Sequence, residues 1–152
     1  MGYTFHNPDE LPKPFDIVWC KFPLRGEVEP GPVARPVLVL ASTKLQYEHD
    51  GVFREIGALI AQYGGDFKLN HIPDNLHIAA GEFKSLGLHK ATVFRLDLGN
   101  RARLIWCEEY FVPQGYVKGQ GMTAGRLNDE QQGRVLACLK ARGLQYPLPP
   151  IV

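Results

Sequence analysis

A single arginine stands at the entrance to an apolar run, and its position is the first feature that could support chemistry. The segment reads GPVARPVLVLAS over residues 31–42, so a Gly-Pro pair precedes Arg35 and an unbroken apolar stretch follows Pro36. An arginine is always charged, and its planar guanidinium can bind two oxygens of a phosphate at once. Held at the end of a rigid strand, Arg35 could stabilise negative charge that develops on a phosphate.

The loop before this run carries further charged residues. Residues 24–34, LRGEVEPGPVA, hold Arg25, Glu27 and Glu29 among glycines and prolines. Unstructured connections of this length are uncommon in a compact domain unless they have a function. Spacing alone leaves two interpretations open. Either Arg35 is a reactive or phosphate-binding group, or it pairs with Glu27 or Glu29 and ties the loop down.

The other residue types that often carry chemistry form no recognisable site. No histidine lies in an HxH, HxxxH or HExxH spacing, and no GxSxG nucleophile motif occurs. Cys20, Cys107 and Cys138 are odd in number and far apart, so neither a zinc site nor a disulfide framework is indicated. Glu108 and Glu109 are adjacent, and side chains at adjacent strand positions point to opposite faces. The sequence therefore predicts no metal and no cofactor.

Composition predicts one globular domain with a hydrophobic core. The chain has 152 residues, of which 45% are hydrophobic and 22% are charged, and its formal net charge is +1. No apolar run approaches the ~20 residues that span a bilayer, and the first residues lack the pattern of a secretory signal. We therefore expect a cytoplasmic protein with no membrane segment. The nearly neutral charge restricts any nucleic-acid site to a local patch.

Several short strands must position these residues. They are recognised by apolar, aromatic and β-branched residues between turn signals, and they cover residues 15–22, 35–42, 75–80, 91–98 and 101–107. The apolar residues of 35–42 are consecutive, which predicts burial on both faces of that strand. Gly99-Asn100 separates the last two strands and is typical of a two-residue hairpin turn.

The last predicted element is a helix near the carboxyl end. Asn128 can open a capping box at its start. Val135, Leu136 and Leu139 form one apolar face, and Gly143 ends the helix.

One segment remains ambiguous from its pattern. In residues 52–63, VFREIGALIAQY, the apolar positions follow helical spacing, whereas Gly57 and the β-branched and aromatic content favour a strand. Residues 81–88 indicate a single helical turn closed by Gly87. Taken together, the elements predict a mainly β (α+β) domain of five or more strands with one C-terminal helix, arranged as a small barrel.

The segments on either side of the charged loop resemble the amino-terminal signature of the MazF/PemK family of toxins. FDIVWCKFP, the glycine- and glutamate-bearing loop RGEVEPG and the strand ARPVLVLAS follow that family's order of strand, loop and RPVLVLS-type strand. The helix after LNDEQ is also similar to the family's last helix. The resemblance is strong over residues 15–42, weak over 52–127 and modest over 127–143. It favours a strand for residues 54–63.

The resemblance implies an SH3-like β-barrel over residues 15–146, with an extended lead-in at 1–14 and a tail at 147–152. It implies the toxin of a type II toxin–antitoxin system, a homodimer whose RNA groove is occupied by a small antitoxin protein. The implied activity is that of a metal-independent endoribonuclease, a hydrolase in which a ribose 2′-OH of single-stranded RNA attacks the adjacent phosphate. The arginine of the family's RP dipeptide acts in proton transfer and charge stabilisation, a role that falls to Arg35.

RNA would be bound by side chains close to Arg35. Unpaired bases need stacking and hydrogen-bonding partners, and the charged loop is well placed to supply them. The predicted RNA-binding residues are Arg25, Glu27, Glu29, Gln62 and Tyr63.

One position departs from the family pattern. The family's second catalytic residue is a threonine, or a serine in some members, near the end of the third main strand, and Gly65 stands in its place. The candidate replacements are Gln62, Tyr63, Asp66, Ser42 and Thr43. Three hypotheses follow. The protein is an active ribonuclease, or a family member of weak or no activity that binds RNA or a protein partner through the same groove, or a protein-interaction barrel in which Arg35 is structural.

Overall fold

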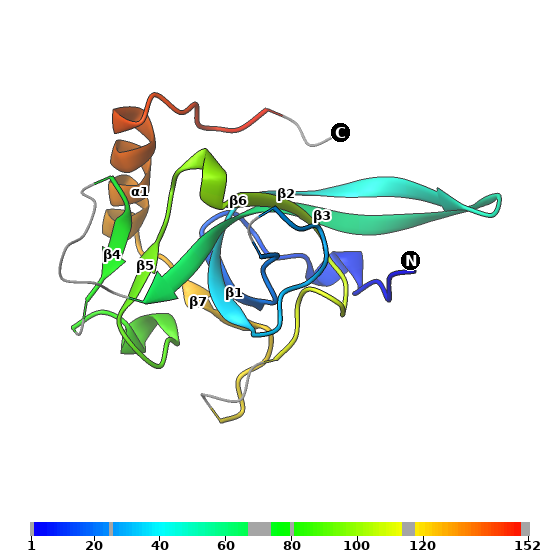
Figure 1. The fold of residues 1–152 in the computed structure, drawn as a ribbon, viewed down its shortest axis with the longest axis horizontal. Coiled ribbons are helices and arrows are strands. Elements are labelled where there is room, and N and C mark those ends of the chain that lie inside the picture. Colours follow the sequence, from blue (N-terminus) through cyan, green and yellow to red (C-terminus); the bar gives the residue numbers. More distant parts are fainter. Residues whose placement is uncertain (1, 25, 67–73, 80, 114–117, 150–152) are drawn as a thin grey trace.

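The protein is a mainly β structure in which a curled antiparallel sheet packs against a C-terminal helix, as the sequence predicts (Figure 1). The computed structural model describes residues 2–24, 26–66, 74–79, 81–113 and 118–149. The strands are β1 (Asp16–Cys20), β2 (Arg35–His49), β3 (Val52–Asp66), β4 (Leu76–Ile78), β5 (Thr92–Phe94), β6 (Arg101–Ile105) and β7 (Thr123–Arg126). The helical elements are α1 (Asp129–Ala141) and the 3-10 turns η1 (Pro8–Glu10), η2 (Lys84–Leu86) and η3 (Leu98–Asn100). The strands are ordered β4-β5-β3-β2-β1-β7, and β6 also pairs with β3.

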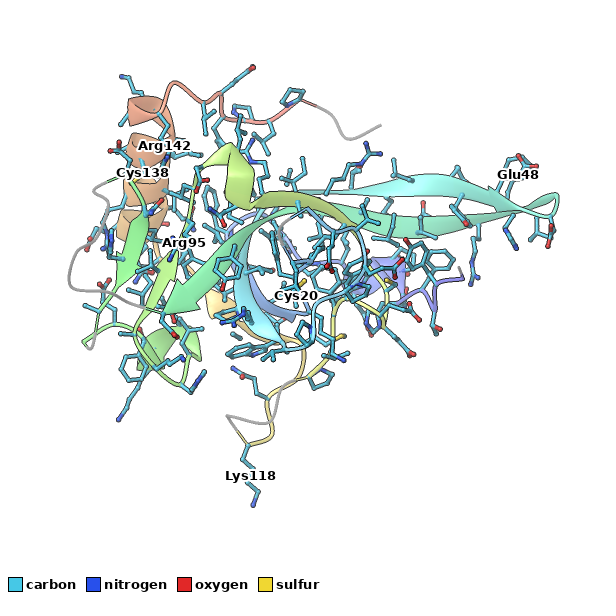
Figure 2. All side chains as sticks on the ribbon, viewed as in Figure 1. Cys20, Glu48, Arg95, Lys118, Cys138 and Arg142 are labelled. Atoms are coloured by element: carbon cyan, nitrogen blue, oxygen red, sulfur yellow. The ribbon has the colours of Figure 1, made fainter. Side chains whose placement is uncertain are left out.

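A long hairpin of β2 and β3 forms the centre of the sheet. Asp50 and Gly51 join the two strands, and both have positive φ, as the tight turns that suit strand twist require. The ambiguous segment 52–63 is therefore part of a strand. The outer part of the hairpin, residues 43–55, projects from the body as an arm (Figure 1), with Glu48 near its outer end (Figure 2).

The predicted hairpin at Gly99-Asn100 is wrong. Instead of pairing with each other, β5 and β6 pair in turn with the same edge of β3, so that Gly64 lies opposite Phe94 and Gln62 lies opposite Arg101. They form one line of strand that is interrupted by residues 95–100, which we call the 95–100 loop. Residues 98–100 of this loop make the turn η3 instead of a two-residue connection.

Both faces of the central strands are buried, as the consecutive apolar residues of β2 predict. Leu38 and Leu40 point into a core shared with α1 and β4, whereas Val37 and Val39 point into a second core with Trp106. Because neighbouring residues of a strand face opposite sides, two cores require an unbroken apolar sequence.

The helix α1 has the predicted capping box at Asn128, and Gly143 follows it with a φ of 70°. Val135 and Leu139 are fully buried against the sheet, but Leu136 is 41% exposed, so the predicted apolar face is wrong at that position. Residues 135 and 139 are one turn apart, and residue 136 is rotated away from them towards solvent. Among the described residues, no helix is long and apolar enough to cross a membrane.

The amino-terminal lead-in lies against the body of the protein. Phe5 forms a β-bridge with Cys107, and its ring meets that of Tyr47 on the arm edge-on, with 5.1 Å between ring centroids. The guanidinium of Arg54 lies 5.0 Å from the centre of the same Phe5 ring. The lead-in therefore connects the arm, at the Tyr47–Arg54 pair, to the core.

Candidate functional site

A pocket of about 340 Å³ opens at the mouth of the apolar strand. It lies between the loop that follows β1, the start of β2, the end of β3 and the 95–100 loop. Its lining residues are Phe22, Pro23, Leu24, Pro32, Val33, Arg35, Tyr63, Arg95, Gly99 and Asn100. Two arginines and two aromatic rings thus face a pocket that no described carboxylate lines.

Arg35 occupies the position that the sequence predicts for it. It is the first residue of β2 and pairs with Cys20, and its guanidinium lies 5.6 Å from the centre of the Tyr63 ring. The Phe22 ring in turn meets Tyr63 edge-on at 5.5 Å. A cation above an aromatic face is attracted by the ring's negative π-face. The stack of Arg35 on Tyr63 on Phe22 therefore holds the guanidinium at the pocket wall.

A glycine allows the charged loop to close beside this stack. Gly31 donates its backbone N–H to Lys21, and a Cβ at position 31 would lie 2.3 Å from the carbonyl oxygen of Phe22. A larger residue would push the two ends of the loop apart. The Gly-Pro pair before Arg35 therefore fixes the approach of the chain to β2.

The alternative that Arg35 pairs with a loop carboxylate is not observed. No hydrogen bond or ion pair joins Arg35 to Glu27 or Glu29 within the described ranges of the chain. The two glutamates line a second cavity of about 400 Å³, which shares Phe22, Pro23, Leu24 and Gly99 with the first pocket. Arg25, the remaining charged residue of this loop, lies outside the described residues.

Tyr63 covers the position at which the resembling family has a threonine. Residues 63 and 65 lie on the same face of β3. A Cβ at Gly65 would be 2.8 Å from the ring carbon Cε1 of Tyr63 and 3.5 Å from its hydroxyl oxygen. The tyrosine ring therefore fills the space above Gly65, and its hydroxyl lies close to that position.

The other candidate replacements lie elsewhere. Ser42 and Thr43 pair with Leu59 and Ala58, on the order of 20 Å along β2 from Arg35 at the usual rise of a strand. Asp66 forms an exposed ion pair with Lys90 at 2.6 Å. None of the three lines the pocket.

Gln62 is brought beneath the pocket instead of onto its surface. Its side chain is fully buried, and its Nε2 group donates to the backbone carbonyls of Arg95, Asp97 and Asn100 at 2.7, 3.1 and 3.3 Å. Its Oε1 atom accepts a hydrogen bond of 2.5 Å from Nε of Arg101. In this arrangement Gln62 has no surface to offer RNA, and all of its hydrogen-bonding groups are engaged by the 95–100 loop and Arg101.

Arg95 is a pocket residue that the sequence analysis missed. It contributes the second guanidinium of the pocket, and Figure 2 labels it between β5 and the curl of the sheet. No local motif marks it, because its place depends on the interruption between β5 and β6. The pairing of both strands with β3 is the only signal that places it there.

Two observations on the described residues bear on metal binding and on the reactivity of the Cys20 and Cys107 thiols. The described residues contain no group of three or more histidines, cysteines or acidic residues that could hold a metal ion. Burial raises the pKa of the Cys20 thiol well above its ordinary value and raises the pKa of Cys107 to about 11. Both thiols are therefore protonated and unreactive near neutral pH.

Comparisons of this chain with protein-family models, with curated proteins and with solved structures gave no match.

Proposed function

We propose that the protein is a MazF/PemK-like endoribonuclease that cuts single-stranded RNA without a metal. The observation that carries this proposal is Arg35, which lies on Tyr63 in an open pocket and has no carboxylate partner among the described residues. A guanidinium left free in this way is suited to an anion, and the aromatic walls are suited to unpaired bases.

The proposed chemistry is a transfer at phosphorus. The ribose 2′-oxygen gives its proton to solvent water and bonds to the adjacent phosphorus. The bond between phosphorus and the 5′-oxygen breaks, and the 5′-oxygen takes up a proton from solvent. The products are a 2′,3′-cyclic phosphate and a free 5′-OH. Arg35 neutralises the charge that builds up on the phosphate oxygens. We assign the hydroxyl of Tyr63 to the place of the family's threonine, because its ring covers Gly65.

The proposal extends to the setting that the resemblance implies. The curled sheet would be a small SH3-like barrel, and the protein would be a cytoplasmic toxin and a homodimer. Its natural inhibitor would be a small antitoxin that occupies the Arg35 pocket. This occupant would supply the carboxylates that the pocket lacks.

Incubation of purified protein with single-stranded RNA in EDTA tests the proposal. We expect cleavage products that end in a cyclic phosphate and begin with a 5′-OH, and we expect Arg35→Ala to form them far more slowly. Arg54→Ala is the matched control, because Arg54 also lies over an aromatic ring but on the arm, away from the pocket. Intact RNA after prolonged incubation with folded wild-type protein would contradict the proposal.

A second candidate function is binding without cleavage. It is favoured by Gly65, which leaves the phenol of Tyr63 as the one side-chain hydroxyl among the described lining residues of the pocket. In that case RNA stays intact, yet it binds with an affinity that falls steeply with salt, because phosphate contacts release counterions. Arg35→Ala would then weaken binding. Only a binding measurement would detect this effect, because the wild type would not cleave RNA.

A further inference from the structure

The 95–100 loop is built into the sheet at both ends. The backbone N–H of Arg95 donates to the carbonyl of Tyr63, so residue 95 still continues the line of β5. Six residues later, Arg101 pairs with Gln62 and resumes the strand as β6. The loop therefore leaves and rejoins β3 at neighbouring positions, and its path is fixed by the register of that strand.

Gln62 anchors this loop from below. The side-chain amide of Gln62 reaches three of the loop's carbonyls, those of Arg95, Asp97 and Asn100. A fully buried amide with these acceptors is costly to disturb, because each carbonyl would lose its partner away from water. The loop conformation thus depends on one side chain of β3.

The acidic side chain of the loop is hydrogen-bonded within the loop. Both carboxylate oxygens of Asp97 accept hydrogen bonds from Nδ2 of Asn100, at 2.8 and 3.0 Å. Leu96 is fully buried, and its N–H donates to Oδ1 of Asn75 at 3.0 Å. The nearest acidic residue of the loop is therefore turned towards the loop itself, and the 95–100 loop gives the pocket Arg95, Gly99 and Asn100 without a carboxylate.

The guanidiniums of Arg35 and Arg95 line the resulting pocket, and neither has an acidic partner among the described residues. The Nε atom of Arg95 is buried and has no hydrogen-bond partner in the part of the chain that the structure describes. The Nη2 atom of Arg101, which lines the second cavity instead, is also buried and unpartnered within those residues. Arg35 lines the same pocket and lies over the Tyr63 ring. Buried donors and unpaired cations are costly unless a ligand satisfies them, and an anion is the complementary ligand.

We infer that Arg95 is a second phosphate-binding residue of the pocket, which acts beside Arg35, and that Gln62 is the positioning residue that holds it there. The ligand group is a phosphate of a single-stranded nucleic acid, and this identification rests on the proposed function. Arg35 and Arg95 together would bind the phosphate oxygens from two sides, while Tyr63 and Phe22 supply the apolar wall against which a base stacks.

The test uses a short mixed-sequence 2′-O-methyl RNA carrying a fluorophore. Its 2′-oxygen is blocked, so it cannot be cut by 2′-OH attack, and binding is measured apart from catalysis. Fluorescence anisotropy over a range of salt concentrations gives the affinity and its salt slope. We expect Arg95→Ala to weaken binding about tenfold and to reduce the slope by ~0.7, the value for one phosphate contact on a single strand. Arg54→Ala, the control of equal charge, should leave both values unchanged.

The role of Gln62 needs a readout that general loss of stability would not give. Gln62→Met should weaken binding in the wild-type background and change nothing further in the Arg95→Ala background, since its effect passes through Arg95. Equal losses in both backgrounds would overturn the positioning role. If Gln62→Met does not fold, Asn100→Ala, which frees the carboxylate of Asp97, should reproduce the weakened binding, and unchanged binding by that variant would count against the inference.

The outcomes separate this inference from the proposed function. If the wild type cleaves RNA and Arg95→Ala binds the probe as well as wild type does, the inference about Arg95 is wrong and the proposed nuclease activity stands. If binding depends on Arg95 but no RNA is cleaved, the inference is supported and the proposed nuclease activity is contradicted. If inorganic phosphate displaces the probe as readily as unlabelled RNA does, the bound phosphate does not belong to a nucleic acid. RNA should compete far better than free phosphate, because its bases add stacking contacts.

Discussion

Replacing Gln62 by methionine removes the hydrogen bonds that hold the 95–100 loop while it keeps the volume of the side chain. The two N–H groups of the amide serve three carbonyls, and Oε1 accepts from the charged Arg101. The side chain is fully buried, so water cannot replace these partners without opening the sheet.

The size of the effect follows from these contacts. A neutral hydrogen bond contributes ~1 kcal/mol and one to a charged group ~1.5–3 kcal/mol. Two amide donors and one charged partner therefore add up to about 3–5 kcal/mol of lost unfolding free energy. This is a large part of the stability of a typical domain, ~5–15 kcal/mol, and corresponds to a fall in Tm on the order of 10 °C.

Urea unfolding followed by tryptophan fluorescence measures this loss, because Trp19 and Trp106 are both buried. Gln46→Met is the matched control, since Gln46 is exposed on the arm, and it should change the unfolding free energy by less than ~0.5 kcal/mol. A Gln62→Met variant as stable as this control would refute the account of the 95–100 loop.

Two further outcomes follow from α1 and its neighbours. Leu139→Ala should lower the unfolding free energy by ~2–5 kcal/mol because it leaves a cavity in the core, whereas Leu136→Ala should cost less than ~1 kcal/mol because Leu136 is exposed; urea unfolding distinguishes the two. Burial raises the pKa of Glu82, but hydrogen bonds from Gln131 and Arg134 outweigh it and leave this pKa below its usual range. A carboxyl group whose pKa is lower in the folded protein stabilises the fold at pH values above its unfolded-state pKa, and this stabilisation is lost as the pH falls through the folded-state pKa. The difference in unfolding free energy between wild type and Glu82→Gln should therefore shrink from about pH 7 to about pH 3. An advantage that grows on acidification would contradict this.

Structural features that are set by residues close together in the sequence could be predicted from the sequence. The Gly-Pro pair and the apolar run predict Arg35 at the start of a strand, and the capping box predicts the start of α1. The helical spacing of residues 52–63 misleads by itself because β3 is buried on both faces over much of its length. Residues 56–61, IGALIA, carry no polar side chain, and such a run contains helical spacing by chance.

Features set by long-range pairing could not be predicted in this way. Gly99-Asn100 carries a hairpin signal, but the edge of β3 is free to pair with both flanking strands, and that pairing removes the hairpin. Asp50-Gly51 carries an equally good local signal and does form the turn. Arg95 and the buried state of Gln62 follow from this same register, so neither could be assigned before the strand order was known.

The central claim is that Arg35 stabilises charge on a phosphate during cleavage of single-stranded RNA. The rate constant for cleavage of a defined RNA by excess enzyme in EDTA tests it most directly, with Arg35→Ala compared with Arg54→Ala. Loss of one donor to a developing oxyanion lowers such rates by ~10²–10³, so we expect a fall of this size for Arg35→Ala and a rate close to wild type for Arg54→Ala. Equal rates for the two variants, or no cleavage by folded wild-type protein, would contradict the claim.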